Sequence, residues 1–246
     1  MSRITTFAEI FNLMATLYLV PNVLAEGHWQ NVLPAQVSSV LTETRFFIVE
    51  NIRTARRFMK QVNQEIDIDA CTFYEINKRT DPKDLPRFLK PLEDGNDVAV
   101  ISEAGCPGVA DPGADVVRIA HQKGLKVVPL VGPSSILLAL MASGLNGQNF
   151  AFRGYLPVKP NERSKELSSL DKQIKTQNQT QIFIETPYRN NQLAEDILKS
   201  CSPSTLLCIA KNITGENELI QTKTIQDWKK CKVPDLHKQP TIFLMG

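Results

Sequence analysis

The stretch from residue 98 to residue 135 constrains the fold of this chain more than any other. Two β-favouring apolar runs, 98–101 and 126–130, flank a short amphipathic helix, and each run ends in Gly, Pro and Ser residues. This is the pattern of a βαβ unit, in which the two strands are parallel. Parallel sheets bind ligands at the carboxyl ends of their strands, where a following helix adds free backbone N–H groups. The sequence therefore predicts a ligand site at these two loops.

Segments typical of strands and helices alternate along the whole chain, and the pattern restarts after Phe150. We expect strands at 16–21, 45–50, 71–76, 98–101, 126–130, 181–185, 205–210 and 240–245, with a short one ending near 157 and another running into a helix at 223–228. Helices are expected at 32–42, 54–64, 82–94, 134–144, 161–176 and 191–200. Such alternation is typical of an α/β fold. The break predicts two α/β domains, 14–131 and 132–246, after an N-terminal extension at 1–13.

The composition is that of an ordinary globular protein, with 42% hydrophobic residues, 22% charged residues and a net charge of +2. This balance indicates no nucleic-acid partner by itself, although a local basic face remains open. The five cysteines show no CxxC spacing, which favours free thiols and a cytoplasmic location. The three histidines are far apart, so no metal site is predicted. No apolar run reaches the roughly 18 residues of a membrane helix, so no membrane contact is expected.

Two loops carry a more specific pattern. They read SEAGCPGVADPG at 102–113 and VVPLVGPSS at 127–135. Both resemble the signature of the tetrapyrrole methylase superfamily, and within it the branch that methylates a ribose 2′-hydroxyl of small-subunit ribosomal RNA. The resemblance covers nearly the whole chain, from about Met14 to Gly246. It implies two α/β domains with S-adenosylmethionine bound in the cleft between them, RNA of the small ribosomal subunit as partner, and a homodimer.

The resemblance also assigns residues to the cofactor. Small side chains at the two loops would let the backbone approach it closely, and Cys106 stands where the family usually has Thr. The family's other contact positions fall on the end of the first strand and on two strands of the second half. The implied cofactor-binding residues are Pro21, Gly105, Cys106, Pro107, Val109, Ala110, Ser134, Ser135, Ala210 and Pro240.

Three further motifs at strand ends are similar to those of the RNA branch. VENIRTARR at 49–57 contains Glu50, Arg53 and Arg56; GYLPVK at 154–159 contains Lys159; FIETPYR at 183–189 contains Glu185 and Arg189. The resemblance implies that Glu50 and Glu185 are catalytic, since a carboxylate can orient or deprotonate a hydroxyl. It implies that Arg53, Arg56, Lys159 and Arg189 bind the substrate, because cations hold RNA phosphates. Two interpretations stay open for Arg163 and Lys165, which follow the second motif: contact with the RNA backbone, or a solvated basic helix.

The chain departs from the family at several positions. The loop 22–30 differs from the usual TPxGNLxDI, Asn51 and Ile52 replace Asp and Thr, and Tyr188 replaces His. These changes keep two alternatives open beside the rRNA methyltransferase. One is methylation of a porphyrin or corrin ring. The other is a protein that binds S-adenosylmethionine and has lost the chemistry.

Overall fold

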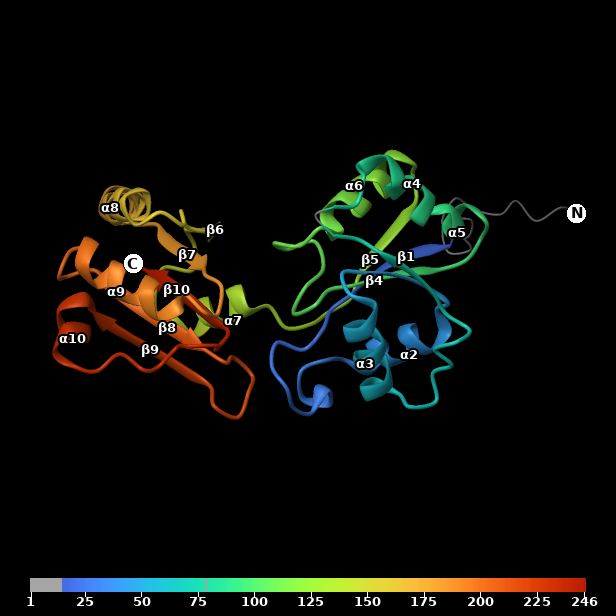
Figure 1. Ribbon diagram of the computed structural model, residues 1–246, viewed down its shortest axis with the longest axis horizontal. Helices are drawn as coiled ribbons and strands as arrows, with labels where there is room; N and C mark the ends of the chain where they lie inside the picture. Colours follow the sequence, from blue (N-terminus) through green and yellow to red (C-terminus); the bar gives the residue numbers. More distant parts are fainter. Residues whose placement is uncertain (1–14, 78) are drawn as a thin grey trace, which may run out of the picture. The chain divides into compact units, whose positions relative to one another are not determined.

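The computed structural model describes residues 15–77 and 79–246, which form two compact units (Figure 1). The N-terminal unit holds the described residues up to Val23 together with His28–Pro133, and the C-terminal unit holds Leu24–Gly27 and Ser134–Gly246. Part of the loop after the first strand therefore clusters with the second half of the chain. The extension predicted at 1–13 lies outside the described residues.

The N-terminal unit contains a parallel sheet with the strand order β3-β2-β4-β1-β5. The strands are β1 (Thr16–Val20), β2 (Phe46–Val49), β3 (Thr72–Glu75), β4 (Val98–Ile101) and β5 (Lys126–Pro129). The chain leaves β1 toward β2 on one side and leaves β4 toward β5 on the other. The switch point of the sheet therefore lies between the neighbouring strands β1 and β4, where open α/β sheets bind their ligands.

Helices cover both faces of this sheet, as Figure 1 shows. One face is covered by α2 (Ala35–Glu43) and α3 (Ile52–Val62), the other by α4 (Leu85–Phe88), α5 (Lys90–Glu93) and α6 (Gly113–Gln122). The inner strands β2 and β4 are apolar without alternation because helices cover both faces of the sheet; all four residues of β4 are buried. Two short 3₁₀ turns complete the unit, at Trp29–Asn31 and Pro82–Asp84.

The single helix predicted at 82–94 is wrong. The structure has a 3₁₀ turn followed by two four-residue helices, α4 and α5. Pro86 and Pro91 each lie in the first turn of one of these helices. A proline inside a continuous helix would remove a backbone hydrogen bond and clash with the preceding turn, so the chain restarts the helix at each one.

The C-terminal unit contains a mixed sheet with the order β6-β7-β10-β8-β9. Its strands are β6 (Phe150–Tyr155), β7 (Thr180–Ile184), β8 (Leu206–Lys211), β9 (Leu219–Thr224) and β10 (Thr241–Met245). Only β6 and β7 are parallel; the other neighbours are antiparallel. Helix α7 (Ser135–Ser143) packs on one face, and α8 (Pro160–Gln177), α9 (Asn190–Ser200) and α10 (Ile225–Lys230) pack on the other. Among the described residues, no helix has the length and apolar character needed to cross a membrane.

Candidate active site

The loops after β1, β4 and β5 are tied together at the switch point of the N-terminal sheet. The Asn22 and Gly105 backbones exchange two hydrogen bonds, of 2.9 and 3.1 Å, and the Asn22 side-chain amide donates to the carbonyl of Ser102 at 3.0 Å. A Cβ at Gly132 would overlap the ring of Pro21, so only glycine lets the loops after β5 and β1 approach this closely. Three strand ends therefore form one compact surface.

Asp111 organises the loop after β4 from the inside. Its Oδ1 accepts the backbone N–H groups of Gly108 at 2.7 Å and Gly113 at 2.8 Å. Ala110, the residue just before it, has a φ of 61°, a left-handed conformation that is uncommon for a residue with a side chain. Strained backbone of this kind concentrates at ligand sites. Asp111 is not among the residues predicted for the site, although an Asp two residues before a Gly is a typical signal of such a side-chain turn.

The residues predicted to bind the cofactor in the N-terminal unit lie along this surface. Gly105 and Pro107 are buried in the loop, and the Cys106 thiol lies 3.4 Å from the Pro133 carbonyl oxygen. Val109 and Val131 expose 48% and 73% of their surface. Exposed apolar side chains beside a tightly built loop are what a binding surface for a partly apolar ligand requires.

Three carboxyl groups lie around the carboxyl ends of β2 and β4. Burial raises the pKa of Glu50, the Asp111 carboxylate raises it further, and a hydrogen bond from the Glu103 backbone N–H acts against this rise. Burial also raises the pKa of Glu103, against a hydrogen bond with Thr54, and the pKa of Asp111, against its two backbone hydrogen bonds. Groups with shifted pKa values gather at functional sites more often than elsewhere. Among the described residues, no cluster of His, Cys, Asp and Glu is suited to a metal ion.

Helix α3 begins beside these carboxyl groups, and one of its faces is basic. Asn51 caps the helix, because its side chain accepts the Thr54 N–H at 3.1 Å. Asn and Asp cap helices about equally well, so this departure from the family motif keeps its structural role. Ala55, Phe58, Met59 and Val62 form the buried face of α3.

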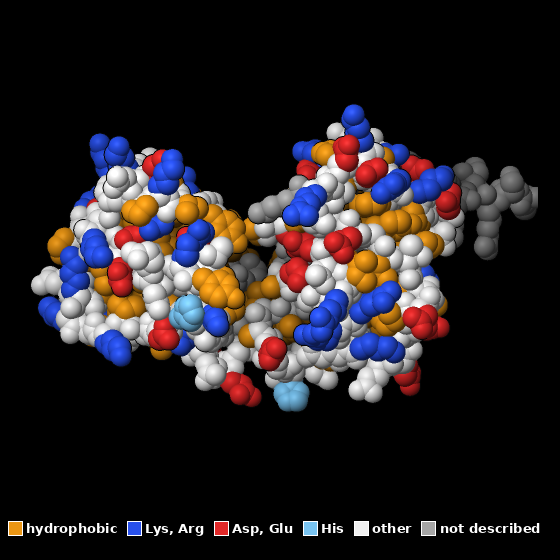
Figure 2. Space-filling model, in the orientation of Figure 1, with side chains coloured by type: hydrophobic (Ala, Val, Ile, Leu, Met, Phe, Trp, Pro, Cys, Tyr) orange, Lys and Arg blue, Asp and Glu red, His pale blue; other side chains and the backbone are white. Residues whose placement is uncertain are grey.

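The opposite face of α3 is exposed and carries only positive charge. It consists of Arg53, Arg56, Arg57 and Lys60. Figure 2 shows Lys and Arg side chains grouped over this region. Among the described residues, none of the four forms an ion pair with a carboxylate. The structure thus brings the predicted Arg53 and Arg56 onto one uncompensated basic face.

The predicted residues of the C-terminal unit are more dispersed. Ser134 caps α7, with its hydroxyl accepting the Leu137 N–H at 3.4 Å, and Ser135 is the first residue of that helix. Ala210 is buried in β8. Pro240 lines a pocket of about 700 Å³ together with residues 24–27, 212, 215–217 and 238–239. This pocket includes part of the loop that departs most from the family motif.

Glu185 and Arg189 form an ion pair with each other. Glu185 is buried, and its Oε1 accepts the Arg189 guanidinium at 2.6 Å and the Thr186 N–H at 2.6 Å. Both interactions fix the turn after β7. Lys159 is exposed at the start of α8, where it pairs with Glu162 at 3.1 Å.

The interpretation that Arg163 meets RNA is wrong. Its side chain is 4% exposed and donates to Asp196 at 2.7 Å and to the carbonyl of Val158 at 2.8 Å. Arg163 therefore joins α8 to α9 and to the segment that precedes α8. Lys165, two residues further along the helix, is exposed.

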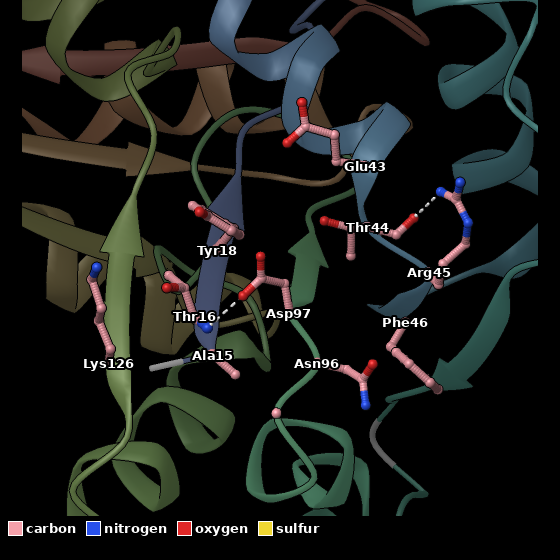
Figure 3. Close-up of a pocket in the computed structure, with 11 residues that line it drawn as sticks. Ala15, Thr16, Tyr18, Glu43, Thr44, Arg45, Phe46, Asn96, Asp97 and Lys126 are labelled. Carbon is pink, nitrogen blue, oxygen red and sulfur yellow. Dashed lines mark hydrogen bonds between the residues drawn. The ribbon is translucent and has the colours of Figure 1, made fainter. Parts of the chain in front are cut away.

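A second pocket lies at the opposite edge of the N-terminal sheet (Figure 3). It measures about 470 Å³ and is lined by residues at the amino ends of β1, β2, β4 and β5, among them Thr16, Arg45 and Asp97. Asp97 accepts the Thr16 N–H at 2.7 Å, and Arg45 donates to the Thr44 carbonyl at 3.0 Å. None of the predicted site residues lines it. The switch point at the carboxyl edge remains the candidate active site.

Comparison with known proteins identifies the family. Residues 39–228, more than half of the chain, match the family described as Tetrapyrrole (Corrin/Porphyrin) Methylases. The chain belongs to this family. The methylase fold is also seen in solved structures: the methyltransferase CobJ aligns with a TM-score of 0.60 and 17% identity over 95% of this chain and 93% of its own. Cobalt precorrin-4 methyltransferase, CbiF, aligns with a TM-score of 0.61 and 12% identity over 94% of both chains.

Curated relatives of this methylase are more similar to it in sequence than these solved structures are. A protein of Pseudomonas aeruginosa named Ribosomal RNA small subunit methyltransferase I is 30% identical over 216 residues, which are 87% of this chain and 72% of the relative. A protein of Vibrio cholerae with the same name is 30% identical over 205 residues, 83% of this chain and 67% of the relative. The expected superfamily and the expected α/β fold are thus confirmed.

Proposed function

We propose that this methylase transfers a methyl group from S-adenosylmethionine to a ribose 2′-hydroxyl of small-subunit ribosomal RNA. The observation that carries the proposal is the similarity, over most of the chain, to relatives named for methylation of this RNA. The basic face of α3 beside the switch point supports it, because four cations without carboxylate partners suit a phosphate backbone.

The loops at the switch point fit the proposed cofactor. Gly105, Cys106, Pro107, Val109 and Ala110 would hold it from the loop after β4. Pro21, Ser134, Ser135, Ala210 and Pro240 complete the proposed set. When bound, S-adenosylmethionine supplies a methyl group already activated by a positively charged sulfonium. The loops then need only exclude water and align the acceptor with that methyl group.

Glu50 is the proposed general base. A ribose hydroxyl is a weak nucleophile, and removing its proton as the new bond forms accelerates attack. A carboxylate whose pKa is raised by burial and by neighbouring carboxylates is a stronger base than one in water, and Glu50 has this environment. Glu185 is also proposed as catalytic. Its carboxylate already accepts a hydrogen bond from Arg189, so we infer that it acts by holding the turn after β7 in place.

The substrate would contact the protein through Arg53, Arg56, Lys159 and Arg189. A titration of RNA tests the first two: replacing Arg53, Arg56 and Arg57 by Ala should weaken RNA binding and flatten its dependence on salt. Calorimetry of the same variant should give the wild-type affinity for S-adenosylhomocysteine. An equal loss of affinity for RNA and for S-adenosylhomocysteine would count against RNA as the substrate. RNA binding that does not respond to salt would do the same.

A second candidate function is cofactor binding without methyl transfer. The ion pair of Glu185 and the altered loop at 22–30 favour it over methylation of a tetrapyrrole. The solved corrin enzymes share only the fold with this chain. Transfer to bare small ribosomal subunits, and none to a precursor corrin, supports the RNA enzyme. Cofactor binding with no transfer to either acceptor supports the second candidate.

The proposal includes a cytoplasmic homodimer. Ribosomal RNA is made and modified where ribosomes assemble, which is the basis for the location. The dimer follows from the family resemblance. Sedimentation equilibrium of the full chain is expected to give twice the mass of one chain, and a single-chain mass at all concentrations would remove the dimer from the proposal.

A further inference from the structure

The turn after β7 presents an exposed aromatic side chain in a basic setting. Tyr188 exposes 69% of its surface. The His237 ring lies edge-on to it, with centroids 5.9 Å apart and planes at 74°, and the Lys238 ammonium lies 5.9 Å from the centroid of the tyrosine ring. Figure 2 shows a histidine with Lys or Arg and hydrophobic side chains near it on the visible face of the C-terminal unit.

The backbone around Tyr188 is fixed on both sides. Arg189 donates its backbone N–H to the Thr186 carbonyl at 2.9 Å, and the buried Glu185 holds both residues through its carboxylate. The neighbouring turn joins this one through the Lys238 N–H, which donates to the Pro187 carbonyl at 3.0 Å. A ring carried by such a turn is held in place before any ligand binds, which lowers the entropic cost of binding.

The segment that carries Lys238 also includes Pro240, one of the predicted cofactor residues. Lys238 has a φ of 58°, a left-handed conformation that side chains rarely adopt. Lys238 and Pro240 line the same pocket. The Asp235 carboxylate in this segment accepts the Asn191 amide at 2.8 Å and the His237 N–H at 3.0 Å, so hydrogen bonds within the protein engage it. The positive charge of Lys238 is left beside the ring, whereas Arg189 is paired with Glu185.

We propose that Tyr188 is a stacking platform for an unpaired base of the RNA substrate, with Lys238 contacting the adjoining phosphate. The inference rests on the proposed function, which supplies the RNA. Proteins recognise single-stranded RNA by stacking bases on exposed aromatic rings, while nearby cations neutralise the backbone. The ring, the fixed turn and the Lys238 ammonium meet these requirements in one place. A base held there would position its strand beside the pocket that contains Pro240.

The test compares two tyrosines of the same unit. Tyr155, on β6, is 60% exposed and serves as the matched control for Tyr188. Binding of a fluorescent single-stranded RNA oligonucleotide is measured by anisotropy, beside an abasic oligonucleotide with the same backbone. Tyr188→Ala should weaken binding of the RNA by about tenfold, because stacking of one base contributes that much. Tyr188→Phe and Tyr155→Ala should bind like the wild type.

The abasic oligonucleotide isolates the stacking contribution. It should bind the wild type and Tyr188→Ala equally, since it has no base to stack. Lys238→Ala should weaken both oligonucleotides, and its effect should shrink as salt rises. Wild-type RNA binding that Tyr188→Ala leaves unchanged would overturn the platform and leave the proposed function standing. No RNA binding by the wild type would overturn both. A parallel loss of affinity for S-adenosylhomocysteine would show that Tyr188 supports the fold instead.

Discussion

At the scale of single residues, Asp111 and Glu50 have different roles in the candidate site. Asp111 points into its own loop and fixes the backbone, whereas Glu50 lies at the end of β2 among other carboxyl groups. The two side chains influence each other, because the Asp111 charge raises the pKa of Glu50. Substitutions at the two positions should therefore have different consequences.

Asp111→Ala should weaken cofactor binding by about tenfold or more, because two backbone N–H groups lose their acceptor and the loop loses its fixed form. Asp111→Asn keeps an oxygen at the same position and should bind nearly as well as the wild type. Calorimetry with S-adenosylhomocysteine measures both affinities. If Asp111→Ala bound the cofactor like the wild type, the loop would not be the cofactor surface.

Glu50→Gln should lower turnover by roughly 100-fold, the usual contribution of a general base, with little change in RNA affinity. In the wild type, turnover should rise as the pH passes the raised pKa of Glu50 and the carboxylate forms. Glu50→Gln should lose this dependence. Single-turnover rates across the pH range measure it, and a variant with wild-type turnover would exclude Glu50 as the base.

The same substitution should stabilise the protein at neutral pH. The pKa of Glu50 is higher in the folded than in the unfolded state, so the folded state binds this proton more tightly. The contribution of Glu50 to stability is therefore lost as the pH rises from the pKa of Glu50 in the unfolded state through its higher pKa in the folded state. Glu50→Gln removes this loss. Denaturant unfolding at pH 7 and at pH 4 tests it: the variant should gain stability relative to wild type only at the higher pH.

At the scale of elements, the Arg163–Asp196 pair joins α8 to α9 inside the C-terminal unit. Arg163→Ala leaves the Asp196 carboxylate without its partner, which should lower the free energy of unfolding by about 3 kcal/mol. Lys159→Ala, four residues earlier at an exposed position, should change it by less than about 1 kcal/mol. Denaturant unfolding compares the two variants. A small effect at Arg163 would show that Asp196 finds another partner or water.

The elements themselves follow closely from local sequence patterns. The runs at 98–101 and 126–130 predicted β4 and β5, and the Gly-Pro-Ser loops predicted where they end. Contacts between distant residues could not be predicted this way. The acidic partner of Arg163 lies 33 residues away, so the sequence suggested an RNA contact where the fold has an ion pair. The antiparallel pairing of β8, β9 and β10 was also beyond the strand pattern, because alternation of strands and helices does not fix strand direction.

The candidate site was predictable to a similar degree. The two signature loops identified the strand ends that meet at the switch point. They did not reveal that Asn22 and Gly132 tie these loops together, since such contacts depend on strand order. The pairing of Glu185 with Arg189 was missed for a different reason: the two residues were assigned separate roles, although four residues apart at a strand end is close enough for an ion pair.

At the scale of the whole molecule, the proposed RNA methyltransferase combines a cofactor surface, a base and a basic face. Transfer of labelled methyl groups from S-adenosylmethionine to bare small ribosomal subunits tests this claim most directly. A methylated 2′-oxygen blocks alkaline cleavage of the next phosphodiester, because that oxygen is the nucleophile in the cleavage. We predict that the label remains in an alkali-resistant dinucleotide and that Glu50→Gln loses the label. Label found only on bases, or no label with a protein that still binds the cofactor, would contradict 2′-O-methylation of RNA by this protein.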